Sequence, residues 1–274
     1  MRKLFGSVSC ALFLSAFLFA GVAFAASEFT IDGSTTVLPF AQSTAEAFMS
    51  QFPGVRISVS GSGSGNGARA LIDGVIAIAS MSRTMRDSEI SDANANGINP
   101  VQHIVAVDCI LPIVHPLNPV QDLTVEQLRD IYAGNITNWS EVGGDDARIA
   151  VVGRDSSSGT YEVWEEKIMQ GTLVTPRALV VASSGAVVQT VANNPISIGY
   201  DSLGYVDPSL VKGLDIEGVK GTPETARANT IATSRMLFMY TDGEPTGVLK
   251  DYLDFLKSDD GQAYVAREGF VTLK

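Results

Sequence analysis

Three short stretches of the sequence combine small hydroxyl residues with glycine. They are GSTT at 33–36, SGSGSGNG at 60–67 and RDSSSGT at 154–160. Hydroxyl groups of Ser and Thr donate hydrogen bonds to oxyanions, and glycine, which lacks a Cβ, lets backbone N–H groups approach an ion closely. Arg154 adds a planar guanidinium that can hold two oxygens at once. These residue types predict an oxyanion-binding site.

Each of these stretches joins a strand-like run to a segment with a helical pattern. The unpaired N–H groups at a helix N-terminus, together with the helix dipole, favour anions. Plain helix capping is the alternative, and it would be sufficient to explain any one stretch alone. Three such junctions in one chain, one of them with an arginine, favour a ligand site.

The elements that must position these junctions follow a regular order. Short β-branched runs alternate with amphipathic segments, for example VRISVS before ARALIDG, which predicts an α/β fold with largely parallel strands. The apolar run at 104–114, interrupted by Asp108 and Pro112, is interpreted as a strand that passes from one lobe to another. RMLFMYTD predicts a further strand, and the helix after it has a periodic set facing a core: Val248, Tyr252, Phe255 and Leu256.

The N-terminus predicts export. Arg2 and Lys3 precede an apolar run that ends in Ala23-Phe24-Ala25, which is typical of a signal peptide cleaved after residue 25; a single membrane anchor is the alternative. Without Arg2 and Lys3, 17 basic residues face 30 acidic ones, a net charge of −13. Such a charge argues against nucleic acid or an anionic membrane as partner.

The sequence offers little to an enzyme or a metal site. Cys109 is the one cysteine after residue 25, so an internal disulfide is excluded, and His103 and His115 are the only histidines. A zinc site or a Ser-His-Asp triad is therefore not expected. GSGNGA at 63–68 formally fits a dinucleotide fingerprint, but no acidic residue ends a second strand, and no P-loop or G-x-S-x-G elbow occurs. We expect neither cofactor nor catalysis.

Several segments taken in order carry a resemblance. They are IDGSTTVLPFAQSTAEAF, ISVSGSGSGNGARALIDG, IASMSRTM, VVGRDSSSGTYEVW, ISIGYDSLGYV and FLKSDDGQAYVAREGFV. The chain resembles the periplasmic phosphate-binding proteins that serve phosphate ABC transporters. The resemblance implies a two-lobed type II periplasmic-binding-protein fold of the α/β class, with mixed, mainly parallel sheets and a hinge. It also implies a monomer that captures inorganic phosphate in the periplasm and passes it to the permease and ATPase subunits of a membrane transporter.

The same resemblance implies a division of the chain and a ligand set. Residues 1–25 are the signal peptide, 26–112 with 215–274 form lobe I, and 113–214 form lobe II. The implied ligand-binding residues are Thr35, Thr36, Ser64, Ser82, Arg83, Arg154, Ser158, Gly159 and Thr160. Local donors of this kind can outweigh the negative surface charge, because charges more than about 8 Å away are screened at physiological salt.

One position departs from the best-known members, which carry an aspartate where this chain has Arg83. That aspartate accepts the proton of the bound phosphate, so its absence leaves Asp32 and Asp155 as candidate acceptors, although Asp155 can instead hold Arg154. Arg83 either touches the ligand or forms a structural salt bridge. The alternatives to phosphate as the ligand are sulfate, molybdate or a small organic anion. A phosphohydrolase that uses the same oxyanion cage is the alternative to a binding protein.

Overall fold

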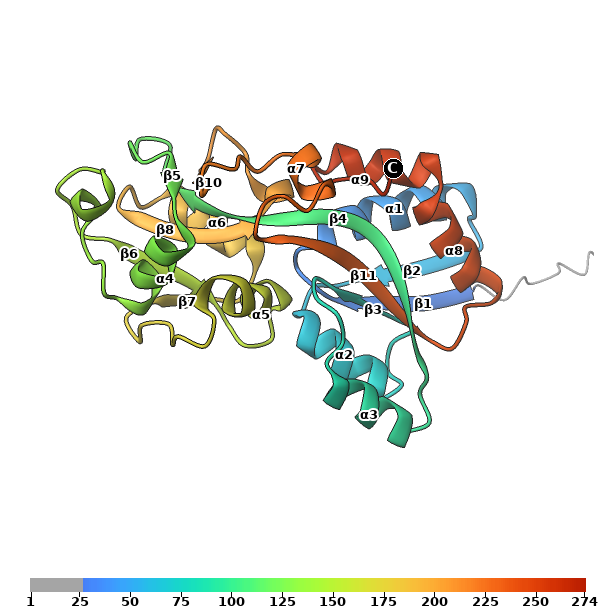
Figure 1. The fold of residues 1–274 in the computed structure, drawn as a ribbon. Coiled ribbons are helices and arrows are strands. Elements are labelled where there is room, and N and C mark those ends of the chain that lie inside the picture. Colours follow the sequence, from blue (N-terminus) through green and yellow to red (C-terminus); the bar gives the residue numbers. More distant parts are fainter. Residues whose placement is uncertain (1–26) are drawn as a thin grey trace, which may run out of the picture.

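The computed structural model describes residues 27–274, so the expected signal peptide at 1–25 lies outside the described residues. Within this range no helix is long and apolar enough to cross a membrane. The chain folds into two lobes joined side by side (Figure 1).

Most strands of the described chain belong to one continuous sheet that runs through both lobes. Its order is β2-β1-β3-β11-β4-β8-β6-β7, with β9 paired to β4, while β5 and β10 pair separately. The bounds are β1 Ser27–Gly33, β2 Val55–Val59, β3 Ile78–Met81, β4 Pro100–Val114, β5 Asp122–Leu123, β6 Ala150–Arg154, β7 Leu179–Val181, β8 Ser197–Ser202, β9 Lys212–Gly213, β10 Asp215–Ile216 and β11 Ser234–Asp242.

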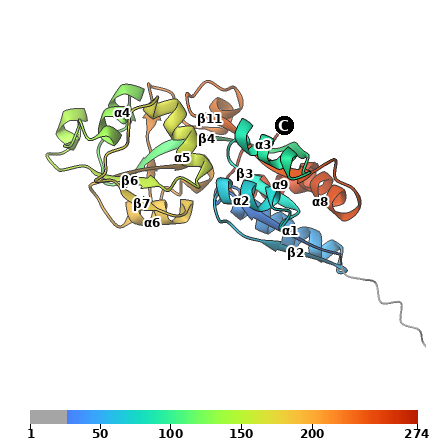
Figure 2. The same ribbon diagram turned by 90° about the horizontal axis from the view of Figure 1, so that it is seen from below.

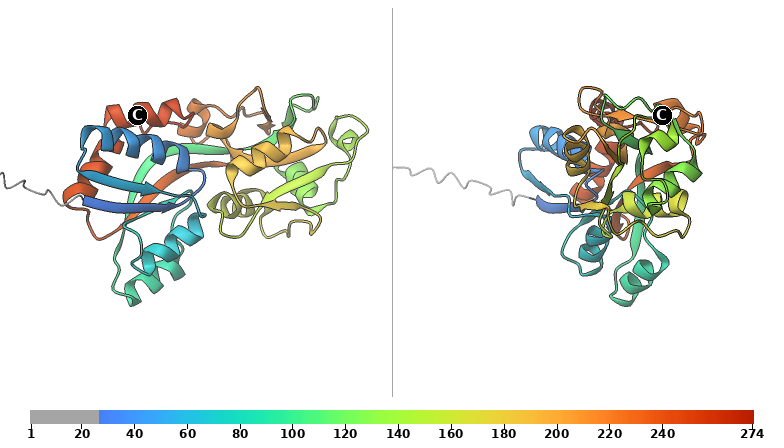
Figure 3. Two further views of the ribbon diagram at one scale, coloured as in Figure 1. Left: turned by 180° about the vertical axis from the view of Figure 1, so that it is seen from behind. Right: turned by 90° about the vertical axis from the view of Figure 1, so that its left-hand side faces the viewer.

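Helices cover both faces of this sheet. Their bounds are α1 Leu38–Gln51, α2 Ser64–Ile72, α3 Asp87–Ala95, α4 Val125–Ala133, α5 Gly159–Trp164, α6 Ser184–Ala192, α7 Pro223–Arg227, α8 Gly247–Lys257 and α9 Asp259–Arg267. A π-helical turn, Glu165–Met169, continues α5. In lobe I, which comprises β1 to β3 with the helices around them, α1, α8 and α9 lie on one side of the sheet and α2 and α3 on the other (Figures 1 and 3).

Strand β4 belongs to both lobes. Its first part pairs antiparallel with β11 from Pro100 to Cys109, and its last part pairs antiparallel with β8 from Ile110 to Val114. The prediction that the interrupted apolar run crosses between lobes is therefore confirmed. Lobe II comprises β6 to β8 with α4, α5 and α6, and Figure 2 shows it beside lobe I.

The sheet is mixed rather than uniformly parallel. Strand β1 pairs parallel with β2 and β3 in lobe I, and β6 pairs parallel with β7 and β8 in lobe II. The antiparallel pairs all involve β4 or β11, the strands that lie between these two parallel groups. Parallel pairing thus brings the carboxyl ends of β1, β3 and β6 toward the same region, where the next residues form the junctions.

Each lobe has its own core. In lobe II, Trp164 stacks on Tyr200 with ring centroids 4.4 Å apart, and both side chains are buried. In lobe I, Tyr252 and Leu256 are buried, and Val248 and Phe255 pack against the same cluster. The predicted core face at the C-terminus is confirmed, but the expected single helix divides at Ser258, whose side chain accepts the N–H of Gly261 and caps α9.

Candidate functional site

The three hydroxyl-rich junctions meet around one small enclosed cavity between the lobes. Its empty space of about 110 Å³ does not admit even a water-sized sphere, so the walls lie almost in contact in this arrangement. Its lining residues are Ser34, Thr35, Thr36, Gly63, Ser64, Ser82, Arg154, Ser158, Gly159 and Thr160. Eight of the nine residues expected at the site are among them, and Arg83 is the exception.

The first wall is the turn between β1 and α1. Gly33 has φ +135°, and a Cβ there would lie 2.1 Å from the carbonyl oxygen of Ser80, so no other residue fits this close approach. The Ser34 hydroxyl accepts the N–H groups of Thr36 at 3.1 Å and Val37 at 3.4 Å. These contacts hold the turn in shape before α1 begins.

The second wall is the start of α2 together with the end of β3. Gly63 has φ +108°, a backbone conformation that side chains rarely permit. Ser64 then begins α2, and its Oγ accepts the backbone N–H of Ser82 at 3.1 Å. The two hydroxyl oxygens lie 3.3 Å apart, so Ser64 and Ser82 form one polar patch on lobe I.

The third wall is the N-terminus of α5. Ser158 caps the helix by accepting the N–H of Tyr161 at 3.2 Å. The first-turn N–H groups of Gly159 and Thr160 have no acceptor inside the helix and remain available to a ligand. A Cβ on Gly159 would lie 2.5 Å from Ser64 Oγ and 2.7 Å from Ser82 Oγ, so glycine lets this helix end approach lobe I.

Arg154 supplies a buried positive charge to this cavity. It is 4% exposed, and no carboxylate of the described chain forms a salt bridge with it. Its Nη1 donates to Ser184 Oγ at 3.3 Å, and its Nη2 donates to Thr35 Oγ1 and to the Ala182 carbonyl, both at 3.1 Å. Three of its five N–H groups are thereby used, and the buried Nε has no protein acceptor among the described residues. A buried guanidinium that no carboxylate contacts, and that keeps free N–H groups, can pair with a bound anion.

The hydroxyl groups around the cavity are set as donors. Ser34, Thr35, Ser64, Ser158 and Thr160 each accept a hydrogen bond from an N–H group of the protein. A hydroxyl that accepts in this way still has its own proton to donate. The Thr35 hydroxyl donates to Ser184 Oγ at 3.5 Å, and the other hydroxyls, together with free helix N–H groups, present donors to whatever lies inside.

The sequence did not single out two buried polar residues that support this ring. Ser184 begins α6, a fourth helix N-terminus, and its N–H donates to Thr35 Oγ1 at 3.3 Å. Arg235 lies on β11, and its Nη1 donates to Thr160 Oγ1 at 3.0 Å and to the Ser82 carbonyl at 3.2 Å. Its Nε donates to Asp108 at 2.8 Å. The sequence signal for the pair of Arg235 and Asp108 was that each is a charged residue inside an apolar strand.

A second buried carboxylate, Asp201, lies at the end of β8. Burial raises its pKa to about 6, while the charge of Arg154 and hydrogen bonds from Ser202 and Ser184 act in the opposite direction. Its Oδ2 has no hydrogen-bond partner among the described residues. Asp201 does not line the cavity, but its charge interacts with that of Arg154.

Comparisons with known proteins agree with this geometry. Residues 20–260 match the model of the PBP superfamily domain. The chain is 33% identical to the phosphate-binding protein PstS of Bacillus subtilis over 248 residues, which cover 90% of this chain and 81% of that protein. It is 30% identical to PstS of Borreliella burgdorferi, covering 89% of this chain and 90% of that one. The chain belongs to the PstS family of phosphate-binding proteins.

A solved structure with a ligand supports the same family. It is a phosphate ABC transporter substrate-binding protein from Clostridium perfringens with bound phosphate, 35% identical to this chain, with a TM-score of 0.83; the match covers 90% of this chain and all of that one. An ABC-type phosphate transport receptor from Vibrio cholerae is 34% identical with a TM-score of 0.73, covering 89% and 99% of the two chains. The two-lobed type II fold expected from the sequence is thus confirmed.

In this member of the PstS family, Arg83 points away from the cavity. Its guanidinium pairs with Glu89 through Nη1 and Nη2, both at 2.7 Å, and its Nε lies 2.7 Å from Glu162. The salt-bridge interpretation of Arg83 is therefore the one that its contacts support. Ser82, the residue before it, is the one that lines the cavity.

The two aspartates considered as proton acceptors also lie outside the lining. Asp32 accepts hydrogen bonds from Ser60 and from the N–H and hydroxyl of Ser62. Asp155 accepts from the N–H and hydroxyl of Ser157, so it caps a turn and does not hold Arg154. Since neither carboxylate lines the cavity, neither is placed to take a proton from a ligand in it.

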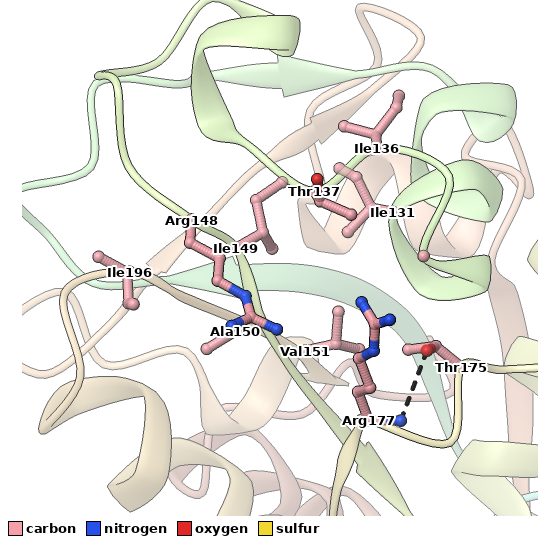
Figure 4. A pocket seen from close by; sticks show the side chains of 11 residues that line it. Ile131, Ile136, Thr137, Arg148, Ile149, Ala150, Val151, Thr175, Arg177 and Ile196 are labelled. Atoms are coloured by element: carbon pink, nitrogen blue, oxygen red, sulfur yellow. Dashed lines mark hydrogen bonds between the residues drawn. The ribbon is translucent and has the colours of Figure 1, made fainter.

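A second cavity lies in lobe II, where residues of α4 and β6 and of the loops beside them line it (Figure 4). It has a volume of about 260 Å³ and an apolar floor that includes Ile131, Ile149 and Ile196, with Arg148 and Arg177 beside it. Both arginines are exposed, so their charge is solvated rather than buried. None of the residues expected at the site lines this cavity. Among the described residues no cluster of His, Cys, Asp and Glu could hold a metal ion.

Proposed function

We propose that this protein captures inorganic phosphate outside the cytoplasmic membrane and delivers it to the permease and ATPase subunits of an ABC transporter. The observation that carries the proposal is Arg154, a buried guanidinium without a carboxylate partner in the described chain, facing a small cavity ringed by hydroxyl donors. The names of its relatives and the phosphate-bound structure of the protein from Clostridium perfringens support phosphate as the ion.

The proposed ligand contacts come from both lobes. Lobe I contributes Thr35, Thr36, Ser64 and Ser82, and lobe II contributes Arg154, Ser158, Gly159 and Thr160. Hydrogen bonds to a charged group contribute about 1.5–3 kcal/mol each, whereas micromolar affinity needs only about 8 kcal/mol net. A handful of such donors can therefore bind phosphate tightly even after the costs of desolvation and ordering.

Binding is proposed to proceed by closure of the lobes, with no covalent step. Lobe I is taken as 26–112 with 215–274, and lobe II as 113–214. The change of partner of β4 between Cys109 and Ile110 supports a hinge near this boundary, because a strand that passes between two lobes can bend where its pairing changes. The cavity needs a hinge since it is enclosed by both lobes and phosphate must enter and leave.

The proposed location is the periplasm, with residues 1–25 removed during export. The supporting pattern is the basic N-terminus followed by an apolar run and Ala23-Phe24-Ala25. We expect the mature protein to be a monomer. Mass spectrometry of the protein recovered from the periplasmic fraction checks the first point, because it should give a chain that begins at Ala26.

The ligand itself can be identified without a titration. Protein purified without added phosphate is denatured, and the phosphate released is measured by a colorimetric molybdate assay. The proposal expects stoichiometric release from the wild-type protein, because a closed, donor-lined cavity retains its ion through purification. Absence of released phosphate, together with no uptake of radioactive phosphate by the refolded protein, would contradict the proposed function.

A further inference from the structure

A cluster of four charged side chains joins the two lobes beside the phosphate cavity. Arg83, Arg86 and Glu89 belong to lobe I, and Glu162 of α5 is the single member from lobe II. Glu162 lies 2.7 Å from Arg83 Nε, and its two oxygens lie 2.8 Å from Arg86 Nη2 and 2.9 Å from Arg86 Nε. One carboxylate of lobe II therefore meets two guanidiniums of lobe I.

The cluster is partly buried and internally ordered. The side chains of Arg83 and Glu162 are 6% and 14% exposed. Glu89 holds both Nη atoms of Arg83 at 2.7 Å and accepts the backbone N–H of Arg86 at 2.8 Å. The guanidinium of Arg83 is thus held by contacts within lobe I whether or not lobe II is near. Preorganised, charge-assisted pairs lose less conformational entropy when they form.

Position along α5 links this cluster to the ligand. Glu162 follows Gly159 and Thr160 by less than one helical turn, and those residues present their N–H groups to the cavity. A contact that fixes Glu162 against lobe I therefore fixes the helix end that binds the ion. The charge is also balanced only in the closed arrangement, since opening leaves two arginines with one glutamate on lobe I and an unpaired glutamate on lobe II.

We propose that Glu162, paired with Arg83 and Arg86, is the positioning contact that holds the lobes closed on phosphate and thereby sets its affinity. This inference rests on the proposed phosphate binding. The apparent affinity of a ligand that needs a minor conformation scales with the population of that conformation. Loss of the contact lowers the closed population, so phosphate binds more weakly and leaves faster, although Glu162 does not line the cavity.

The test is isothermal titration with phosphate and arsenate, with dissociation rates from stopped-flow exchange. Glu162→Gln is expected to weaken phosphate binding roughly ten- to a hundred-fold, mainly through a faster dissociation rate. The affinity for arsenate should fall by the same factor, because closure does not distinguish the two ions. Glu166→Gln is the matched control, since it removes the same charge from the exposed continuation of the helix, where Glu166 pairs only with Lys167.

A double-mutant cycle separates this role from direct ligand contact by Arg83. In the Glu162→Gln background, Arg83→Gln should cost little further affinity if Arg83 acts through Glu162, and should still cost tenfold or more if it touches the ion. Arg86→Gln provides a second route, because Arg86 is half exposed and its loss should not impair folding. Small-angle scattering of the phosphate-saturated variants measures closure directly.

The outcomes are distinct. Phosphate affinity of Glu162→Gln within twofold of wild type, or equal losses in Glu166→Gln, overturns the positioning role. A further tenfold or greater loss of phosphate affinity on adding Arg83→Gln also overturns it and would indicate that Arg83 contacts the ligand. A wild-type protein that binds no phosphate contradicts the proposed function instead, so the two failures are not confused.

Discussion

The Nη1 atom of Arg235 lies 3.0 Å from the Oγ1 atom of Thr160, so a strand beside the hinge contacts a hydroxyl of the ligand cavity. Arg235 also pairs with Asp108 on β4, and Asp108 accepts a hydrogen bond from Ser202 on β8. Because an arginine only donates, Thr160 must direct its own proton elsewhere, toward Thr36 or the ligand. Arg235 thereby contacts both lobes and determines the direction in which the Thr160 hydroxyl donates its proton.

Replacement of Arg235 by lysine should weaken phosphate binding about tenfold. A lysine ammonium lacks the planar fork that reaches Asp108, the Ser82 carbonyl and Thr160 together, and a lost hydrogen bond to a charged group costs about 1.5–3 kcal/mol. Calorimetric titration of the variant measures the change. Arg56→Lys, at an exposed position of β2, serves as control, and equal affinities of the Arg235→Lys and wild-type proteins would contradict the role of Arg235.

Loss of the Arg154 side chain should have a larger effect. Arg154→Ala removes the buried cation whose Nε and one further N–H group have no protein acceptor among the described residues. We expect phosphate affinity to fall at least a hundredfold, which corresponds to about 3 kcal/mol. Equilibrium dialysis with radioactive phosphate provides the measurement, with circular dichroism to check that the variant is folded. A fall of less than tenfold in a folded variant would remove Arg154 from the site.

Gly159→Ala tests the close approach of the lobes. The added Cβ would lie 2.5 Å from Ser64 Oγ, whereas a Cβ at Gly185, which also lies in the first turn of a helix, meets nothing within 4 Å. Overpacking of this kind costs about 1–3 kcal/mol, and here the strain is relieved by opening. Phosphate affinity should therefore fall about tenfold in Gly159→Ala and stay unchanged in Gly185→Ala. Similar affinities for the two variants would show that the lobes do not close to this distance.

Asp201 predicts a pH dependence of folding stability. Burial raises its pKa from the ordinary value near 3.9 to about 6 in the folded protein, so the folded state binds more protons than the unfolded state between these values. Stability contributed by this group is therefore present below about pH 4 and is lost as the pH rises to about 6, on the order of 2–3 kcal/mol. The groups that face Asp201 are Arg154, Ser184, Ser202 and Arg235.

Urea unfolding of wild type and Asp201→Asn between pH 4 and pH 7 measures this contribution. The asparagine variant cannot titrate, so the difference in unfolding free energy between the two proteins should change across that window in favour of the variant as the pH rises. Asp145→Asn, at an exposed loop position, should leave the profile parallel to that of wild type. A difference between wild type and Asp201→Asn that is independent of pH would be evidence against a raised pKa.

The sequence predicted the three junctions because their signal is local. Thr35, Ser64 and Thr160 stand at strand-to-helix turns whose residue types indicate both the turn and its donors. Asp108 and Pro112 likewise marked β4 as the crossing strand. The buried residues that support the cavity wall were missed because their partners are far apart in sequence. Arg235 meets Thr160 only through antiparallel pairing of β4 with β11, which periodicity does not reveal.

Arg83 shows the other limit of sequence reasoning. Its place next to Ser82, in a segment that resembles the family, made ligand contact and a salt bridge equally reasonable. Which one occurs depends on side-chain direction at the end of β3, where alternate residues face opposite sides. Glu89 lies six residues away and Glu162 lies on another lobe, so the carboxylates that pair with its guanidinium appear only in the folded molecule.

Hydroxyl and N–H donors together with the Arg154 guanidinium are proposed to bind phosphate in this cavity. Calorimetric titration of refolded, ligand-free mature protein with phosphate, repeated with Arg154→Ala, measures this binding. We expect saturable one-to-one binding to the wild-type protein and loss of that binding in the folded Arg154→Ala variant. No heat of binding by the wild-type protein, or full binding by the variant, would contradict the proposed site.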